Sequence, residues 1–189
     1  MRPEIQQIDR NDPEQIAAYE QGFYEAFAPI SNPGTRALWI WDDENRRLKT
    51  RVPYDHQEIF VIKNEEGAVT SGLAFNMRVE HFQSGEYGFE RPADDHIWVE
   101  TMVIFSRTGK MLHCFEFGRR WLIEHGIDCT YATCSDKVLA LYLQIGAKLV
   151  GKSEIDSQVR YFLMFPLDKP YFIYPDQAAP AKKTENTPA

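Results

Sequence analysis

The segment from Ile97 to Phe105 constrains the fold of this chain more than any other. Every residue in it is apolar or β-branched except Glu100. Strands of this composition are buried on both faces, which happens at the centre of a sheet that has covering layers on both sides. The segment therefore predicts a central strand, and the rest of the chain must supply helices to cover it.

The flanking sequence supplies helices and further strands in the order β-α-loop-β-β-β-α-β-α-β-β, which predicts one mixed α/β domain over residues 1–175. A strand–helix–strand–helix–strand unit follows three earlier strands. Residues 176–189 lack core-forming side chains, and we expect them to be a disordered tail. The predicted strands are Glu4–Ile8, Ile59–Lys63, Ala68–Val79, Ile97–Phe105, Cys129–Cys134, Leu149–Val150 and Val159–Phe165, and the later helices are Gly109–His125 and a helix from Ser135 or Asp136 to Gly146.

The first helix has a strong start signal. Asp12 can cap it, Pro13 suits its first position, and Gln15 completes a capping box. We expect Pro29 and the pair Pro33-Gly34 to stop it. Residues 31–57 give a weaker pattern, a short helix with a long loop, whose aromatic side chains either pack on the core or line a substrate pocket.

Composition excludes several functions. The formal net charge of −7 argues against nucleic-acid binding and against docking on an anionic membrane. No apolar run is long enough to span a bilayer, and the start of the chain does not resemble a secretory signal. The three cysteines form no CxxC pair, so neither disulfides nor a metal site are expected. We expect a cytoplasmic protein.

The segment Leu141-Tyr142-Leu143-Gln144-Ile145-Gly146-Ala147-Lys148-Leu149-Val150-Gly151 is similar to the pattern L-Y-x-x-x-G-F-x-x-x-G of the GNAT (Gcn5-related N-acetyltransferase) superfamily. The element order over residues 58–165 also resembles that family. The resemblance implies a single GNAT-like domain, with splayed strands in a mixed central sheet flanked by helices. It implies transfer of an acyl group from a thioester to an amine. Acetyl-CoA, another acyl-CoA or the phosphopantetheine of an acyl carrier protein would be the donor, without a metal.

The turn after the central strand is the predicted donor site. It reads Ser106-Arg107-Thr108-Gly109-Lys110-Met111 and departs from the family signature R/Q-x-x-G-x-G/A. A helix N-terminus with nearby positive charge suits a pyrophosphate. An ordinary turn with solvated basic residues is the alternative. The residues predicted to contact the donor are Arg107, Thr108, Gly109, Lys110 and Met111, together with the backbone N–H groups of Met102 and Val103, which would face the oxyanion if the strands splay.

Two residues are predicted to carry the chemistry. Glu100 is the candidate general base, because a carboxylate in apolar surroundings has a raised pKa; a structural, paired glutamate is the equal alternative. His96 is a second base candidate. By resemblance, Tyr142 is the candidate acid that protonates the leaving thiolate. The alternative is that Tyr142 is an aromatic residue of the core. Cys134 is either an acyl carrier or, more often for such a cysteine, a buried filler.

Three functions stay open. The first is N-acyl transfer to a small-molecule or peptide amine. The second is a long-chain N-acyl amino acid synthase or acyl-homoserine-lactone synthase, whose elaborated N-terminal half would match the aromatic segment from Trp39 to Tyr54. The third is a GNAT-fold module that binds ligand without catalysis. No nucleic-acid or membrane partner is expected, and an exposed edge strand could pair two copies in a homodimer.

Overall fold

A mixed sheet forms the centre of the computed structural model, which describes residues 4–93, 95–155 and 157–172. In this part of the chain, the strands run in the order β1-β4-β5-β6-β7-β9-β8, and only β6 and β7 are parallel neighbours. The bounds are β1 Gln6–Gln7, β4 Gln57–Lys63, β5 Val69–Asn76, β6 Trp98–Ser106, β7 Cys129–Ser135, β8 Lys148–Ile155 and β9 Gln158–Pro166.

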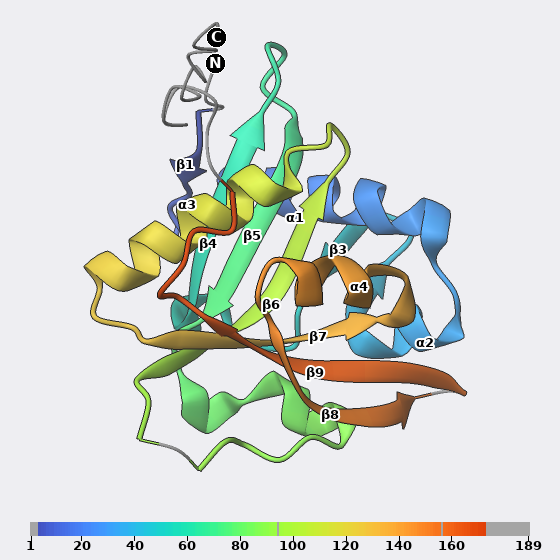
Figure 1. Cartoon of the computed structure of the whole chain (residues 1–189). Coiled ribbons are helices and arrows are strands. Elements are labelled where there is room, and N and C mark those ends of the chain that lie inside the picture. Colours follow the sequence, from blue (N-terminus) through green and yellow to red (C-terminus); the bar gives the residue numbers. More distant parts are fainter. Residues whose placement is uncertain (1–3, 94, 156, 173–189) are drawn as a thin grey trace, which may run out of the picture.

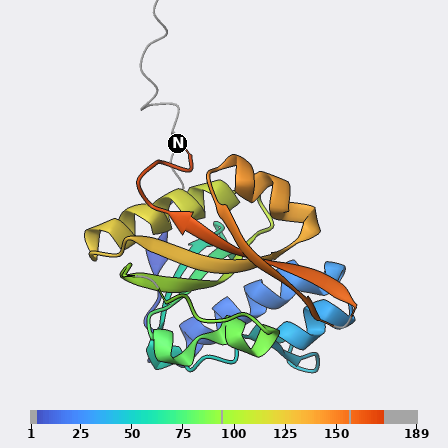
Figure 2. The same ribbon diagram turned by 60° about the horizontal axis from the view of Figure 1, so that its bottom comes forward.

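Helices cover both faces of this sheet (Figures 1 and 2). On one face lie α3 (Met111–Glu124) and α4 (Asp136–Gln144), and on the other lie α1 (Pro13–Phe27) and α2 (Pro33–Leu38). The chain folds as a single α/β domain, as predicted. Its shorter 3-10 turns are η1 Ala28–Ile30, η2 Tyr54–His56, η3 Val79–His81 and η4 Gln83–Tyr87.

The predicted central strand is confirmed. β6 holds the middle position of the sheet, and nearly all of its residues are buried. One apolar core lies between the sheet and α1, and it includes Phe23, Phe105 and Tyr131. A second core lies between the sheet and the helices α3 and α4, and it includes Phe115 and Phe165. A strand with a core on each side must be apolar throughout, which explains its composition.

The start of α1 matches its sequence signals with one difference. Asp12 accepts hydrogen bonds from the N–H groups of Glu14 and Gln15, and Pro13 is the first helical residue. The Gln15 side chain accepts its bond from the N–H of Asp9 rather than from the cap residue itself. The reason is that the N–H of Asp12 already donates to the carbonyl of Asp9 in a tight turn.

Residues 31–57 contain the expected short helix, α2 (Pro33–Leu38), and differ from the prediction in two respects. Pro33 does not stop a helix; it begins α2, which Asn32 caps by accepting from the N–H of Thr35. A separate hairpin follows, formed by β2 (Ile40–Asp42) and β3 (Arg47–Lys49), where a loop was expected. Its strands are too short for alternation to reveal them, and Leu48 alone carries most of its burial in the core under α1.

Gly72 in β5 leaves room for an aromatic ring of the neighbouring strand. A methyl group there would lie 2.5 Å from the ring of Phe105 on β6. The ring of Phe105 stacks in turn on Phe23 of α1, with ring centres 5.7 Å apart. The glycine therefore lets the second half of β6 lie close under α1, where the candidate site is found.

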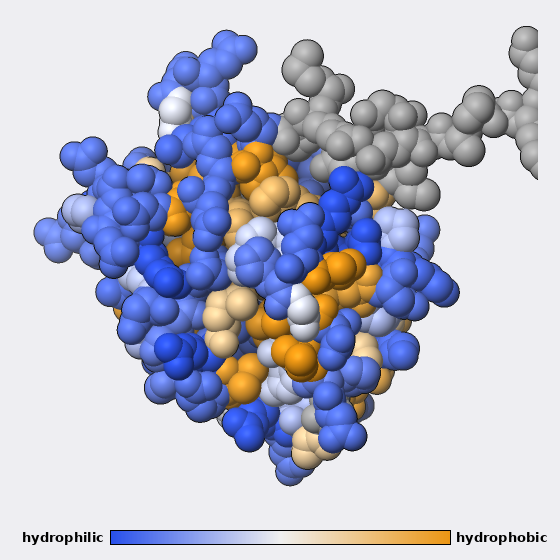
Figure 3. Space-filling view, turned by 90° about the vertical axis from the view of Figure 1, so that its left-hand side faces the viewer, coloured by the Kyte–Doolittle hydropathy of each residue, from blue (hydrophilic) through white to orange (hydrophobic). Residues whose placement is uncertain are grey.

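The surface is mainly hydrophilic on the side that carries β1 and the end of α3, where hydrophobic residues show in small separate groups (Figure 3). Among the described residues, none of the helices is long and apolar enough to cross a membrane. The predicted tail at 176–189 lies outside the described residues.

Candidate active site

The two parallel strands at the centre of the sheet separate halfway along their length. β6 and β7 pair from Trp98 with Cys129 as far as Thr101 with Ala132. Beyond that point β6 continues to Ser106 and β7 to Ser135, while β7 keeps its pairing with β9 on its other side. Figure 1 shows β6 rising away from β7 at a steep angle. The splay that the sequence could only suggest is therefore present as a wedge-shaped opening in the sheet.

A bulge in β6 lies at the start of this opening. On the side of β5, Val103 pairs with Ala74 and Thr101 pairs with Phe75, so Met102 is an extra residue without a partner in β5. Met102 and Val103 consequently both contact the core under α1, although they are adjacent in a strand. A bulge bends its strand and increases its twist. This local distortion accounts for the departure of β6 from β7 directly after Thr101.

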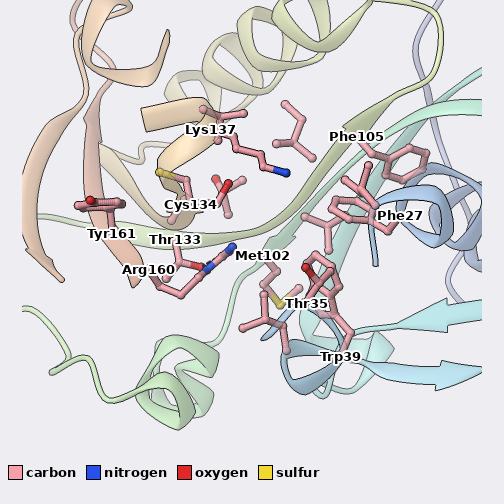
Figure 4. A pocket seen from close by; sticks show the side chains of 18 of the residues that line it. Phe27, Thr35, Trp39, Met102, Phe105, Thr133, Cys134, Lys137, Arg160 and Tyr161 are labelled. Atoms are coloured by element: carbon pink, nitrogen blue, oxygen red, sulfur yellow. Dashed lines mark hydrogen bonds between the residues drawn. The ribbon is translucent and has the colours of Figure 1, made fainter. Parts of the chain in front are cut away.

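A cavity of about 660 Å³ fills the opening, a volume within the usual range for small-molecule sites. Its walls come from elements on both faces of the sheet (Figure 4). They include Ala26 and Phe27 of α1, Leu38 of α2, Trp39, Met102 to Ser106 of β6, Ala132 to Ser135 of β7, Asp136, Lys137 and Tyr142 of α4, and Arg160 of β9.

The cavity has an apolar half and a polar half. Phe27, Trp39 and Phe105 stand together on the side of α1, with the rings of Phe27 and Trp39 4.6 Å apart. Hydroxyl and charged groups gather on the side of β7, α4 and β9. Such a division suits a ligand with a hydrocarbon portion and a polar end. Trp39 thus serves both roles considered for the aromatic segment, since it packs on the core and lines the pocket.

Tyr142 lies at the polar half, on the face of the sheet covered by α3 and α4. Its ring packs edge-on against Phe115 and Phe165, and the residue is only 5% exposed. Burial, with a smaller contribution from the Cys134 thiol, raises the pKa of its phenol. The phenol therefore keeps its proton throughout the neutral range and can donate it inside the cavity.

The predicted donor residues divide into two groups. Met102, Val103 and Met111 line the cavity. Arg107, Thr108, Gly109 and Lys110 form the turn outside its wall, and Arg107 is tied by ion pairing to Glu25 at 2.7 Å and by a hydrogen bond to the carbonyl of Val69. Ser106 accepts from the N–H groups of Thr108 and Lys110 within that turn.

The first turn of α3 nevertheless keeps its anion-binding character. The side chain of its N-cap residue, Lys110, makes no capping hydrogen bond. Met111, the first residue of α3, lines the cavity, so this helix begins at the cavity wall. Helix N-termini of this kind favour negative charge. The start of α3 is therefore the candidate position for a phosphate, while Arg107 is paired with Glu25.

Glu100 lies beside the cavity rather than in its wall, and its carboxylate is fully engaged. Oε2 accepts from the side chain of Asn76 at 3.0 Å and from the N–H of Gln83 at 2.8 Å. Oε1 accepts from the N–H and the hydroxyl of Ser84 at 2.7 and 2.5 Å. Burial raises the pKa of Glu100, against the opposing effect of these hydrogen bonds. The carboxylate holds η4 in place, and η4 in turn supplies Gln83 and Tyr87 to the cavity.

The remaining nucleophile and base candidates are placed differently. Cys134 lines the cavity but is 3% exposed, and burial raises the pKa of its thiol to about 11. A thiol of that pKa is a weak nucleophile at neutral pH. His96 is exposed in the loop before β6, outside the cavity wall.

Solved structures of other proteins share this arrangement of strands and helices. No protein-family model matches the chain, and no curated protein matches its sequence. The acyl-homoserine lactone synthase LasI superposes with a TM-score of 0.66 at 12% identity, over 89% of this chain and 90% of LasI. The CoA-dependent acyl-homoserine lactone synthase BjaI, solved with SAM and isopentyl-CoA, gives 0.64 at 10% identity over 88% and 84%. The N-acyl amino acid synthase FeeM from uncultured soil microbes gives 0.57 at 12% identity over 88% and 91%.

This chain has the GNAT-like fold. The sequence resemblance on Leu141 to Gly151 predicted that fold, and the similarity now extends over nearly the whole chain. At these identities the comparison establishes the GNAT-like fold alone, and the chemistry must be argued from the site.

Two basic residues of the site could not be singled out from the sequence. Arg160 of β9 and Lys137 of α4 both direct their nitrogen atoms into the cavity, from opposite sides (Figure 4). Arg160 lies in the first half of β9, where every residue is exposed or half-buried, so in the sequence it resembles an ordinary solvent-facing residue. Only its position across β7 from the opening gives it a place in the candidate site.

Proposed function

We propose that this chain is an N-acyltransferase that moves an acyl group from a phosphopantetheine thioester to a small amine by direct attack. The observation that carries the proposal is the opening between β6 and β7, which leads into a cavity with walls from both faces of the sheet. A thioester arm can enter from one face while an amine approaches from the other. Holding both reactants in one cavity supplies the proximity that such a reaction needs.

The donor would enter on the face of α3 and α4. The uncapped first turn of α3 would receive phosphate, and Tyr142 and Lys137 stand on the same face. We propose that Tyr142 donates its phenolic proton to the departing sulfur. Its burial supports this role because the raised pKa keeps the proton in place until a thiolate develops beside it.

The reacting carbonyl would lie at the bulge of β6. Met102 has no partner in β5 and faces no strand across the opening, which makes its backbone N–H and that of Val103 candidates for the oxyanion contact. The amine nitrogen attacks the carbonyl carbon, the carbon–sulfur bond breaks, and the sulfur takes the proton of Tyr142. The amine proton passes to water and Tyr142 is reprotonated from solvent.

For the base, the hydrogen bonds on Glu100 favour the structural alternative. Its oxygens already accept four hydrogen bonds, and it stands outside the cavity wall. We therefore propose that Glu100 positions η4 and that water removes the proton of the amine.

A long acyl chain fits the apolar half. Phe27, Leu38, Trp39 and Phe105 would surround it, whereas an acetyl group would leave most of that half empty. The likeness to LasI, BjaI and FeeM supports the same choice, so we propose a synthase of N-acyl amino acids or acyl-homoserine lactones over a general acetyltransferase. The donor is an acyl-CoA or an acylated carrier protein.

A thiol-release assay tests the proposal. The purified chain is mixed with acyl-CoAs of two to sixteen carbons, and separately with acylated carrier protein, in the presence of L-amino acids or S-adenosylmethionine, and the N-acyl product is identified by mass spectrometry. We expect release with long chains and an amine-dependent rate. Donor binding without amine-dependent thiol release in any combination would instead identify a ligand-binding module. The absence of both donor binding and thiol release would refute the proposal.

A further inference from the structure

Arg160 places a guanidinium in the cavity, and none of the described residues sets a carboxylate against it as an ion pair. Its Nη2 lies 3.5 Å from the hydroxyl of Thr133, at the limit of a hydrogen bond. Its Nε is buried and has no hydrogen-bond partner. Within the described residues, no acidic side chain lies within ion-pair distance of it. Other arginines do form ion pairs with an acidic side chain, among them Arg10, Arg36, Arg51, Arg107 and Arg119.

This arrangement is costly unless a ligand completes it. Burial lowers the pKa of Arg160, which is the sign of a cation short of compensating charge. A buried donor left without an acceptor loses its hydration and gains nothing in return. A planar guanidinium is matched best by a planar anion that accepts two parallel N–H bonds, and a carboxylate is such an anion.

The face from which Arg160 reaches the cavity decides which substrate it would meet. Arg160 pairs with Ser135 across β7 and β9, and Phe162, two residues further along its strand, belongs to the core on the α1 side. Tyr142 and Cys134 belong to the core on the α3 and α4 side. Arg160 therefore lies on the sheet face opposite to the uncapped tip of α3, while Lys137 comes from α4 on the donor face.

The charges of the cavity wall support an anionic acceptor. Its charged lining residues, among those described, are Arg160, Lys137 and Asp136, and Asp136 is on α4, on the donor face. As far as the described residues go, the α1 face of the cavity thus presents one positive group and no negative one, surrounded by neutral side chains such as Thr133, Gln83 and Gln158. A carboxylate would find a partner among these residues, and a second cation would not.

We infer that Arg160 binds a carboxylate of the acceptor, so that the acceptor is an amine with a carboxylate close to its nitrogen, as in an α-amino acid. This inference rests on the proposed acyl transfer. It names a specificity-determining residue of that reaction: the carboxylate is held by the guanidinium and the neighbouring amine is directed toward the carbonyl at the bulge of β6.

Paired compounds that differ only in the carboxylate test the inference. Phenylalanine and phenethylamine serve as acceptors in the thiol-release assay, and N-dodecanoyl-phenylalanine and N-dodecanoyl-phenethylamine serve as ligands in calorimetric binding. Each is measured with the wild-type chain, Arg160→Met, Arg160→Lys and Lys137→Met. Melting temperatures establish that each variant is folded, and Arg160→Lys keeps the charge if Arg160→Met does not fold.

We expect the wild-type chain to prefer the acid of each pair, and Arg160→Met to reduce that preference about 10- to 100-fold, the usual loss for a charge-assisted hydrogen bond. Arg160→Lys should keep part of the preference for the acid. The positive charge remains in that variant, but the pair of parallel N–H bonds of the guanidinium is lost. Lys137→Met should leave the preference unchanged.

The binding arm separates this inference from the proposed function. If no acyl transfer occurs but the acid ligand still binds better through Arg160, the proposed reaction fails and the carboxylate site stands. If transfer occurs and Arg160→Met keeps the wild-type preference, the inference is overturned. It is also overturned if Arg160→Met weakens binding of the acyl donor and leaves binding of the acid ligand unchanged, since Arg160 would then bind the donor phosphates.

Discussion

Thr101 of β6 and Ala132 of β7 are the last residues that pair across the two parallel strands. The hydroxyl of Thr101 lies 2.7 Å from that of Thr130, which closes the paired end of the strands at the apex of the wedge. One residue further along β6, the bulge at Met102 turns the strand aside. The base of the cavity is therefore set by backbone pairing that no flexible side chain can shift.

Replacing Tyr142 with phenylalanine should lower kcat about 100-fold for alkyl thioesters, the usual size of a general-acid contribution. With an aryl thioester, whose thiolate leaves without needing a proton, kcat should fall much less. The free energy of unfolding should change by less than about 1 kcal/mol, because the ring and its packing remain. Tyr161→Phe is the matched control: its ring also lines the cavity but its hydroxyl points away from the centre (Figure 4).

Equal losses with both kinds of thioester would contradict an acid role for Tyr142. The residue would then contribute through packing in the core around Phe115.

Replacing Glu100 with glutamine should chiefly destabilise the fold. A glutamine offers one acceptor oxygen in place of two, so donors from Asn76, Gln83 or Ser84 lose their partner. We expect the free energy of unfolding, measured in urea, to fall by roughly 1–3 kcal/mol for each bond lost. A drop in kcat above 100-fold with an unchanged unfolding curve would instead identify Glu100 as the general base.

Narrowing the apolar half should change the preferred chain length. Ala26 lines that half, and Ala26→Phe would fill space that we assign to the acyl chain. Each excluded methylene loses about 0.8 kcal/mol of binding. We therefore expect kcat/KM to fall more than 10-fold for dodecanoyl donors and less than 3-fold for acetyl donors, since displacing two or more methylenes costs at least that much. Gln21→Phe, on the exposed side of α1, is the control, and a uniform loss across chain lengths would count against the assignment.

Glu116 should make stability depend on pH. Burial opposes its ionisation, but hydrogen bonds from Arg119, Arg120 and the N–H of Tyr171 outweigh burial and hold its pKa below the usual value. Because the folded-state pKa is lowered, this stabilisation is complete above the unfolded pKa of about 4.3 and is lost as the pH falls through the folded value.

Urea unfolding at a series of pH values measures this effect. Glu116→Gln should cost roughly 3–5 kcal/mol at neutral pH, the range for breaking a buried pair, and should flatten the acid dependence. Glu124→Gln, on the exposed end of the same helix, should leave both unchanged. If the free energy of unfolding of Glu116→Gln still falls at acid pH as in the wild-type chain, that pH dependence comes from other carboxylates.

The elements with strong local signals could be predicted, and those set by distant contacts could not. Asp12 and Pro13 specify the start of α1 within a few residues, and the composition of Ile97 to Phe105 specifies a central strand. Pro33 was misjudged because proline both ends and begins helices, and the cap at Asn32 decides between them.

The candidate site was harder to predict for the same reason. The bulge at Met102 depends on pairing with β5, and the role of Arg160 depends on its place across β7 from the opening. Neither relationship exists within a short stretch of sequence. The family resemblance could indicate Tyr142 because that residue belongs to a local pattern, whereas the hydrogen bonds that occupy Glu100 come from residues 76 to 84.

A sheet that opens in its middle has two internal edges as well as two outer ones. Past Thr101 and Ala132, the inner margins of β6 and β7 carry peptide groups with no strand beside them. Outer edges are open to any extended chain, but these inner ones border a cavity. An extended ligand with amide groups could therefore bind to the main chain of the protein there as a further strand would, and so add backbone hydrogen bonds to the contacts made by side chains.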